Sequence, residues 1–377
     1  MNERRPLRGH LVGDCQLPSR REVIGRAGSA ALGLAVSTPH GGDLIAAALQ
    51  ASAARADRER FPSGAIIRTV LKDVPPSTIG AVLFHEHLQQ SATFGVQGGP
   101  GVAQPTKHFT EDFDTMVEEL KLALKDGATC LVEAGHADQG RRVPYIRQLS
   151  IASGMPVVLG GGYHSAASYP PEVYHITEDD LVEELVRTSV AERWGAFGEI
   201  GMWADVITPE ERKVARAVCK AHLRTALPIF THTNSGKNAL QQLDVYLSMG
   251  VDPRYLVIGH MADLGDDPKA SIQKTIAQNG AYVGFDRVGR NPKLDENAVP
   301  LVRSIIEAGY ADKLVFGSDG GAFPDILKTK GGTGYARSRT VFLPKLREAG
   351  VDEETIRHMT IDNPRRFLAF VPKKVTL

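Results

Sequence analysis

Short apolar runs alternate with longer amphipathic stretches along the chain from Pro62 onward. The apolar runs contain many β-branched and aromatic residues and predict buried strands at residues 82–87, 129–133, 157–163, 196–200, 229–232, 255–260, 282–285 and 314–318. Between them, apolar residues recur every three or four positions, which predicts helices at residues 112–125, 143–153, 178–191, 209–226, 238–249, 269–279, 297–308 and 339–348.

Eight strand-then-helix units in series favour a parallel sheet, and eight is the number that closes into a (β/α)8 barrel. We therefore predict an α/β fold, a TIM barrel formed by residues 54–377 as one domain. An open, doubly wound sheet is the alternative architecture. It would spread the polar residues described next along a sheet edge, where they could not converge.

Side chains that can bind metal follow the predicted strands at their carboxyl ends: His85, His87, Glu199, His232, His260 and Asp319. Strand side chains alternate between faces, so His85 and His87 point the same way and Glu86 points the other way. A single histidine at a strand end is usually only a hydrogen-bonding group. Its recurrence after successive strands instead predicts a metal site at the carboxyl ends of the barrel strands.

The motifs around these residues resemble those of the phosphotriesterase family of the amidohydrolase superfamily, over residues 80–370. The matching pieces are His85-Glu-His-Leu88, Glu199, Thr231-His-Thr233, Gly259-His-Met-Ala-Asp263, Val283-Gly-Phe-Asp-Arg287, Gly317-Ser-Asp319 and Asp362-Asn-Pro-Arg365. The resemblance implies a barrel-shaped hydrolase with two metal ions.

By this resemblance, one divalent ion is held by His85, His87 and Asp319, the other by His232 and His260, and Glu199 bridges both. Imidazole and carboxylate ligands suit Zn²⁺ best, with Mn²⁺, Fe²⁺ and Co²⁺ as alternatives. Two such ions acidify a shared water, so that a bridging hydroxide attacks an ester-like centre. Asp319 then passes the proton to the leaving group as general acid.

Two departures from the family pattern concern the substrate. Many members carry a carboxylated lysine where this chain has Glu199, and phosphotriester-degrading members carry a histidine where this chain has Arg287, as lactonase-like members do. The resemblance thus favours a lactone or carboxylic ester, with phosphotriesters and N-acyl amides as alternatives. Asp263 is expected to support Asp319 or Arg287, so these three residues form the predicted catalytic set. Outside enzymes, the alternative is a catalytically inactive metal-binding barrel.

Two further polar residues lie near the predicted strand ends. We expect Glu133 to form a supporting salt bridge with Arg141 or Arg142 rather than to bind metal. His164, after three glycines, either lines the pocket or caps a loop.

Aromatic residues and loops are expected to shape the substrate pocket. The candidates for its apolar wall are Trp203, Tyr163, Phe323 and Tyr335. Selectivity is expected to come from the loops at residues 89–108, 287–295 and 320–338. Within the last, the glycine-rich segment 328–334 is a candidate lid.

Charge and composition exclude some partners. Lys+Arg and Asp+Glu both number 44, so the formal net charge is zero and nothing favours nucleic acid or an anionic membrane surface. We expect a small-molecule substrate, no stable membrane insertion, and a homodimer as the candidate assembly.

The N-terminal fifty residues differ in character from the rest. Arg20 and Arg21 precede weakly apolar stretches and a small-residue segment ending at Ala53, which resembles a twin-arginine export signal over residues 1–53. This predicts a periplasmic or secreted protein. An N-terminal extension without an export role is the alternative.

The chain has three cysteines, of which Cys15 falls in this leader. Cys130 and Cys219 read as buried small hydrophobes. Their spacing fits neither a zinc knuckle nor a redox pair, and a disulfide between them stays open as an alternative.

Overall fold

The computed structural model describes residues 61–91, 107–203, 205–264, 267–322 and 324–375. The chain divides into two units, Met1–Arg55 and Ala56–Leu377. The proposed leader, most of the loop at residues 89–108 and Phe323 lie outside the described residues. Within the described part, no helix combines the length and the apolar character needed to cross a bilayer.

Eight parallel strands form the centre of the second unit, and all eight predicted strands are confirmed. They are β3 (Val82–Glu86), β4 (Cys130–Glu133), β5 (Val157–Leu159), β6 (Phe197–Met202), β7 (Ile229–Thr233), β8 (Leu256–Ile258), β9 (Tyr282–Phe285) and β10 (Leu314–Phe316). Their hydrogen-bonded order is β3-β4-β5 and β6-β7-β8-β9-β10, so sequence neighbours are also spatial neighbours. This is the order that a (β/α)8 barrel requires.

The two arcs of strands join at both ends. On one side, the Gly198 amide donates to the Gly161 carbonyl at 2.9 Å. On the other, the Asp319 amide donates to the His85 carbonyl at 2.9 Å, and Glu86 pairs with Gly320 in a parallel bridge. The barrel is therefore closed, and the alternative of an open sheet is excluded.

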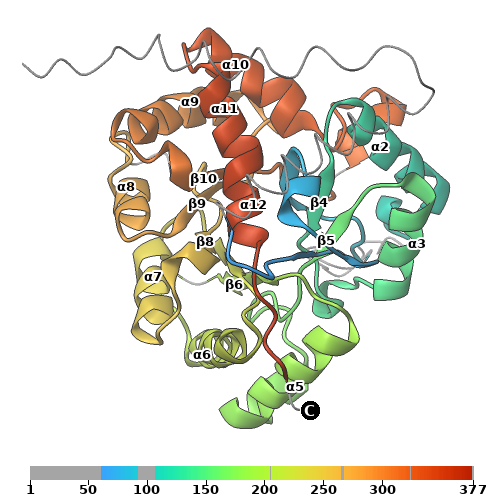
Figure 1. Cartoon of the computed structure of the whole chain (residues 1–377), viewed down its shortest axis with the longest axis vertical. Helices are drawn as coiled ribbons and strands as arrows, with labels where there is room; N and C mark the ends of the chain where they lie inside the picture. Colours follow the sequence, from blue (N-terminus) through green and yellow to red (C-terminus); the bar gives the residue numbers. More distant parts are fainter. Residues whose placement is uncertain (1–60, 92–106, 204, 265–266, 323, 376–377) are drawn as a thin grey trace, which may run out of the picture. The chain divides into compact units, whose positions relative to one another are not determined.

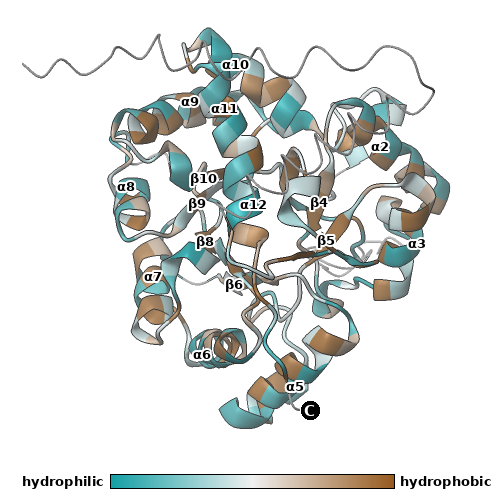
Figure 2. Ribbon diagram, viewed as in Figure 1, coloured by the Kyte–Doolittle hydropathy of each residue, from teal (hydrophilic) through white to brown (hydrophobic). Residues whose placement is uncertain are grey.

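Helices surround the barrel in a ring (Figure 1). They are α2 (Phe113–Lys125), α3 (Val143–Ser153), α4 (Pro171–His175), α5 (Glu178–Ala191), α6 (Pro209–Thr225), α7 (Ala239–Ser248), α8 (Ser271–Gln278), α9 (Pro292–Glu307), α10 (Leu343–Glu348), α11 (Glu353–Arg357) and α12 (Asn363–Leu368). Figure 2 shows that the surrounding helices carry both apolar and polar residues, as amphipathic helices do.

The hydrophobic pattern of the sequence did not predict several short helices and strands. The short α4, α11 and α12 and the two-residue strands β1 (Ile67–Arg68) and β2 (Asp73–Val74) have too few residues to show a period. Helix α9 starts at Pro292, earlier than predicted, because the Asn291 side chain caps its first turn and Pro300 is accommodated inside the helix. The last predicted helix starts as a π-helix, Ser338–Phe342, before α10.

Apolar side chains fill the interior of the barrel at its amino-terminal end. They come from alternate strand positions, such as Val82, Phe84 and Val257. Helix α12 (red, crossing the centre of Figure 1) closes this end, and its Phe367 ring packs against Phe84 at 5.4 Å between centroids. The amino-terminal end is thus a packed core, which leaves the carboxyl end for the site.

Irregularities in two strands turn metal-ligand candidates into the barrel. Leu83 and Phe197 point outward, into the core between strands and helices. Strict alternation would send His85 and Glu199 outward with them. The pairing register shifts between Leu83 and Glu86 in β3 and between Phe197 and Ile200 in β6, and both side chains face inward instead. Bulges often re-aim side chains beside functional sites in this way.

Candidate metal centre

The six predicted ligands converge at the carboxyl end of the barrel. Glu199 lies within β6, and the others lie at or just beyond the ends of their strands. All six are nearly or fully buried: His85, His87, Glu199, His232, His260 and Asp319. His260 and Asp319 adopt left-handed backbone conformations, with φ of 57° and 46°. Such conformations cost energy for non-glycine residues and recur at functional sites, where the surrounding structure holds them.

Glu199 lies at the centre of the cluster. Its Oε1 atom is 2.6 Å from His232 Nδ1, 2.7 Å from His260 Nε2 and 3.3 Å from His85 Nε2. Its Oε2 atom is 3.7 Å from His87 Nε2. One carboxylate therefore faces the histidines expected for both ions, which is the arrangement that a bridging ligand needs.

Asp319 presents its two oxygens to different neighbours. Oδ1 lies 3.1 Å from His87 Nε2 and 3.8 Å from His85 Nε2, on the side of the histidines. Oδ2 accepts hydrogen bonds from Arg287 Nε at 2.9 Å and Arg290 Nη1 at 2.8 Å. The carboxylate therefore joins the histidine cluster to the arginines of the cavity wall.

The donor set fits divalent cations. His85 Nε2 is buried without a hydrogen-bond partner among the described residues and faces Glu199. Ligand atoms within 4.8 Å of one another form three groups: His85, His87 and Asp319; His85, Glu199 and His260; and His164, Glu199 and His232. Imidazole nitrogens and carboxylate oxygens in this number match zinc and related transition metals. The third group adds His164, which was not among the predicted ligands.

Asp286 orients two of the histidines, a role that the sequence did not reveal. Its Oδ2 lies 3.0 Å from His85 Nδ1, and its Oδ1 lies 2.9 Å from His260 Nδ1 and accepts from the His260 amide at 2.7 Å. Gly259 leaves room for it, because a Cβ there would come 2.9 Å from Asp286 Oδ2. Its place directly after β9, within the motif Val283-Gly-Phe-Asp-Arg287, was the sequence feature that could have indicated this role. Carboxylates in this position fix the orientation of metal-binding histidines.

The carboxylates of the centre stay ionised at neutral pH. Burial alone would raise the pKa of Glu199, but the charge of His85 and the hydrogen bonds of His232 and His260 outweigh it and hold this pKa well below its ordinary value. Burial is likewise outweighed at Asp319, where Arg287 and His87 keep the pKa well below the usual range. Burial lowers the pKa of His232 to about 4 despite the nearby Glu199, so this imidazole is neutral and can donate a lone pair.

Asp263 contacts Arg287, which in turn contacts Asp319. Arg287 Nη1 donates to Asp263 Oδ2 at 2.7 Å while its Nε donates to Asp319. Burial would lower the pKa of Arg287, but the charges of Asp319 and Asp263 raise it above its ordinary value. The guanidinium is therefore held rigidly between two carboxylates and stays charged.

An open cavity of about 1120 Å³ lies over this centre. His87, Glu199, His232 and Asp319 form its floor, and Trp203 covers one side, with its ring stacked on His232 at 4.9 Å. His164 also lines the cavity, 3.6 Å from Glu199 Oε2, so it belongs to the pocket rather than to a loop cap.

The prediction that Glu133 forms a salt bridge with Arg141 or Arg142 is wrong. Glu133 accepts hydrogen bonds from the Leu88 and Gly135 amides instead, and burial raises its pKa. Arg141 pairs with Glu192 at 3.4 Å. Glu133 therefore supports the backbone that follows β3 and β4, where amide donors are closer than any guanidinium.

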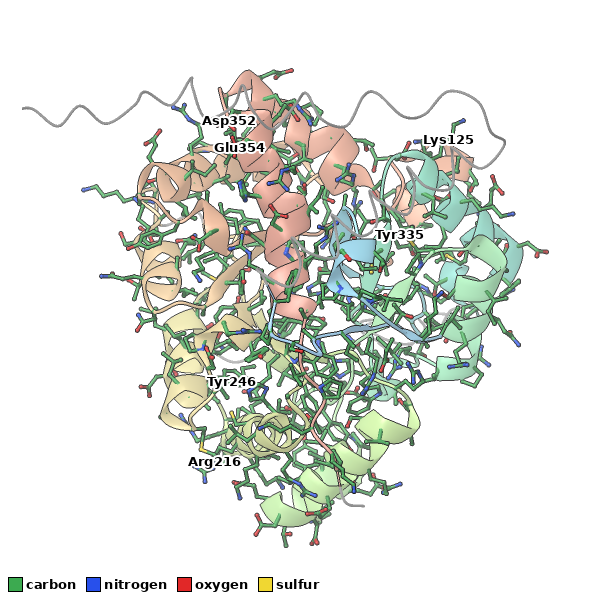
Figure 3. The ribbon with its side chains drawn as sticks, in the orientation of Figure 1. Lys125, Arg216, Tyr246, Tyr335, Asp352 and Glu354 are labelled. Atoms are coloured by element: carbon green, nitrogen blue, oxygen red, sulfur yellow. The ribbon has the colours of Figure 1, made fainter. Side chains whose placement is uncertain are left out.

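The aromatic wall was predicted only in part. Trp203 lines the cavity, but Tyr335 is fully buried and donates its hydroxyl hydrogen to the His87 carbonyl at 2.9 Å. Figure 3 labels Tyr335 within the ribbon, whereas Asp352 lies at its edge. Tyr163 also does not line the cavity, and its hydroxyl donates to Glu184 at 2.7 Å. Both tyrosines turn away from the cavity because their hydroxyls find partners elsewhere.

The candidate lid is tied to the body of the barrel. The amides of Lys328 and Thr329 donate to the buried carboxylate of Glu119 on α2 at 3.0 and 2.7 Å. Lys328 Nζ also pairs with Asp126 at 2.6 Å. These bonds anchor the segment to α2, so its glycines serve tight turns rather than the lid we expected.

Cys130 and Cys219 are both buried and free. Cys130 lies inside the barrel, and Cys219 lies in the layer between strands and helices. The alternative of a disulfide between them is therefore excluded, and both pack as small hydrophobes, as expected.

Comparison with known proteins identifies the family. The sequence signature of the Phosphotriesterase family matches residues 65–368. The chain belongs to this family. Its members are binuclear metal hydrolases, and the chain is an enzyme of the hydrolase class. The buried cluster at the barrel end contains groups that could bind such metal ions.

Relatives of this phosphotriesterase-family chain carry different activities in their names. An aryldialkylphosphatase of Saccharolobus solfataricus is 28% identical over an alignment of 312 residues, which covers 77% of this chain and 95% of the relative. An N-acetyltaurine hydrolase of Rattus norvegicus is 27% identical over 349 residues, covering 81% of this chain and 98% of the relative. The crystal structure of a resiniferatoxin-binding protein from Rhodobacter sphaeroides matches with a TM-score of 0.72 and 29% identity, over 81% of this chain and 95% of that one.

Proposed function

We propose that this protein hydrolyses a lactone or carboxylic ester with two divalent metal ions, most suitably Zn²⁺. The observation that carries the proposal is the place of Arg287, held between Asp319 and Asp263 at the edge of the metal centre. When bound, a pair of divalent cations lowers the pKa of water and polarises the bond to be broken.

In this proposal Asp319 transfers a proton from the attacking water to the leaving group. Its Oδ1 faces the histidines and its Oδ2 is held by Arg287 and Arg290, so the carboxylate is fixed beside the point of attack. It accepts the proton of the attacking water and passes it to the leaving oxygen. Because Arg287 and His87 keep the pKa of Asp319 low, this carboxylate holds the proton only briefly and passes it to the departing alkoxide.

Arg287 distinguishes esters from phosphotriesters. A guanidinium that stays charged cannot relay protons near neutral pH, which is the role of the histidine that phosphotriester-degrading members carry. It can instead donate paired hydrogen bonds to an acyl oxygen. The family includes an aryldialkylphosphatase, so family membership alone does not choose between the two reactions.

An N-acyl amide is the second candidate substrate. The N-acetyltaurine hydrolase relative covers 81% of this chain, which favours this candidate. The same attack serves an amide if the leaving nitrogen is protonated as the bond breaks, and Asp319 is placed to deliver that proton.

The test compares kcat/KM of the zinc-loaded enzyme for a matched lactone, aryl acetate, N-acyl amide and diethyl aryl phosphate. We expect the lactone or aryl acetate to rank first. We also expect Arg287→His to lower that leading activity by about 10- to 100-fold, since a charge-assisted contact is lost.

Arg287→Lys is the control, because it keeps the charge and loses only the forked geometry. We expect its activity to lie between those of the wild type and Arg287→His. A clear preference for the phosphotriester, with little effect of Arg287→His, would contradict the proposal.

A further inference from the structure

Three arginines line the cavity beside the metal centre: Arg287, Arg290 and Arg337. Arg287 bonds both Asp263 and Asp319, through Nη1 and Nε. The other two are not needed to position Arg287. Both line the cavity, and among the described residues the guanidinium of each donates one hydrogen bond.

Arg290 lies in the segment between β9 and α9. Its side chain is 20% exposed, and among the described residues its recorded hydrogen bond uses only Nη1, to Asp319 Oδ2 at 2.8 Å. That oxygen is already shared with Arg287. A guanidinium carries five N–H donors, so most of those of Arg290 are available to a ligand in the cavity.

Arg337 follows β10 and is more deeply placed. It is 5% exposed, and its Nη2 donates to the Ser318 carbonyl at 3.1 Å. Its Nε is buried with no hydrogen-bond partner among the described residues. A buried, charged donor without an acceptor is costly, which points to a ligand that completes it.

The backbone brings the two arginines together. Gly289 has φ of +77°, and a Cβ there would come 2.5 Å from the Arg337 carbonyl oxygen, so the two segments pack backbone against backbone. Burial lowers the pKa of the Arg337 guanidinium, the charge of Glu86 raises it in part, and the nearby charge of Arg290 lowers it. Two like charges are thus held close together at the cavity wall.

The nearest carboxylates are committed elsewhere or exposed. Glu86 accepts from the Ser318 amide and hydroxyl and from the Gly320 amide, and within the described chain it forms no ion pair with Arg337 within 4.0 Å. Asp325 lines the cavity but is solvent-exposed. Neither carboxylate supplies the buried acceptor that the Nε of Arg337 needs.

We propose that Arg290 and Arg337 together bind an acidic group of the substrate, a carboxylate or sulfonate. The inference rests on the proposed function, because the acidic group and the bond that is hydrolysed belong to the same substrate and are separated by only a few atoms. Arg290 touches Asp319, so the acidic group lies near the reacting carbonyl. Paired guanidinium groups match the geometry of such oxyanions.

The experiment uses two lactones that differ only in charge: γ-valerolactone and 5-oxotetrahydrofuran-2-carboxylate, with a methyl or a carboxylate on the same ring carbon. We expect the wild-type enzyme to prefer the carboxylate by kcat/KM. Arg290→Gln should lower that preference ratio by about tenfold or more, because a charge-assisted contact is lost. Arg337→Gln should do the same, and Arg290→Gln decides alone if Arg337→Gln does not fold.

The matched control is Arg303→Gln on α9, whose side chain is 50% exposed and pairs with Glu307 away from the cavity. It changes the net charge equally and should leave the ratio unchanged. Calorimetric binding of tetrahydrofuran-2-carboxylate, which cannot be hydrolysed, gives a second readout. Its Kd should rise by about tenfold in Arg290→Gln.

The outcomes separate the two proposals. If both lactones are hydrolysed with the same ratio in wild type and Arg290→Gln, and the ether carboxylate binds both equally, the acid-binding inference is overturned and the hydrolase proposal stands. If neither lactone is hydrolysed but carboxylate binding still depends on Arg290, the acid-binding site stands and the lactone proposal fails.

Discussion

Asp286 is the residue whose removal tests the metal centre most sharply. It touches no substrate-facing surface and holds His85 through Oδ2 and His260 through Oδ1. In Asp286→Asn, the His260 amide still requires an oxygen acceptor, so the new side-chain oxygen stays there. The new NH2 group then faces His85 Nδ1. His85 must place its proton on Nε2, the atom that points toward Glu199 and the expected ion.

The magnitude follows from this geometry. Loss of a carboxylate that orients a metal-binding histidine lowers metal affinity by about 10- to 100-fold, which is about 1.4 to 2.7 kcal/mol. In Asp286→Asn we expect this loss at the ion held by His85, His87 and Asp319, with a smaller change at the ion held by His260. Asp286→Ala removes both contacts and should weaken both ions.

The assay is a zinc titration of metal-free protein in competition with a chelating indicator, which resolves two binding steps. Asp263→Asn is the matched control, because Asp263 contacts Arg287 and none of the histidines. We expect both of its binding steps to match the wild type. If Asp286→Asn binds two zinc ions as tightly as the wild type, Asp286 does not orient the ligands and the reasoning fails.

Three further predictions concern the metal bridge, a buried carboxyl group and the leader. Metal analysis of reconstituted protein should give two divalent ions per chain, with full activity without bicarbonate because Glu199 bridges directly; one ion at full activity, or a bicarbonate requirement, would contradict this. Burial raises the pKa of Asp138 from 3.8 to about 6, so its ionisation destabilises the fold as pH rises through that range. In urea unfolding, Asp138→Asn should therefore gain up to roughly 3 kcal/mol over wild type at pH 7 and nothing at pH 4; an equal gain at both pH values would count against the shift. Mature protein should lack residues up to about Ala53, and replacing Arg20 and Arg21 by lysine should block export in cell fractionation; full-length wild-type protein left in the cytosol would refute this.

The barrel could be predicted from the sequence because its strands and long helices obey a period. Apolar runs of four to seven residues mark the predicted strands, and α3 and α5 have the predicted bounds. The short α11 and α12 could not be predicted, because they are held by packing under the barrel rather than by their own pattern. Phe367 of α12, for example, is fixed by its contacts with Phe84 and Tyr282.

The ligand set could be predicted by type and position, but its orientation could not. Alternation alone places His85 and His87 on the same face, yet that face would have been the outer one. Only the register shifts in β3 and β6 turn His85 and Glu199 inward. Asp286 directly follows the apolar run of β9, but the sequence does not distinguish a carboxylate that orients histidines from one that binds metal. Arg337 follows no apolar run, so the pattern did not single it out.

At the carboxyl end of this barrel, the candidate metal ligands and the arginines proposed to contact the substrate form two separate sets of residues. The histidines and Glu199 sit on or beside the strands, where the barrel and Asp286 fix them. The arginines sit on the segments that follow β9 and β10, and Asp319 links the two sets by facing histidines with one oxygen and arginines with the other. Loop residues can change while strand ligands stay, so one metal chemistry can serve several substrates. Relatives of this chain are named as an aryldialkylphosphatase and an N-acetyltaurine hydrolase. Exchanges at Arg290 should therefore alter substrate preference more than metal affinity.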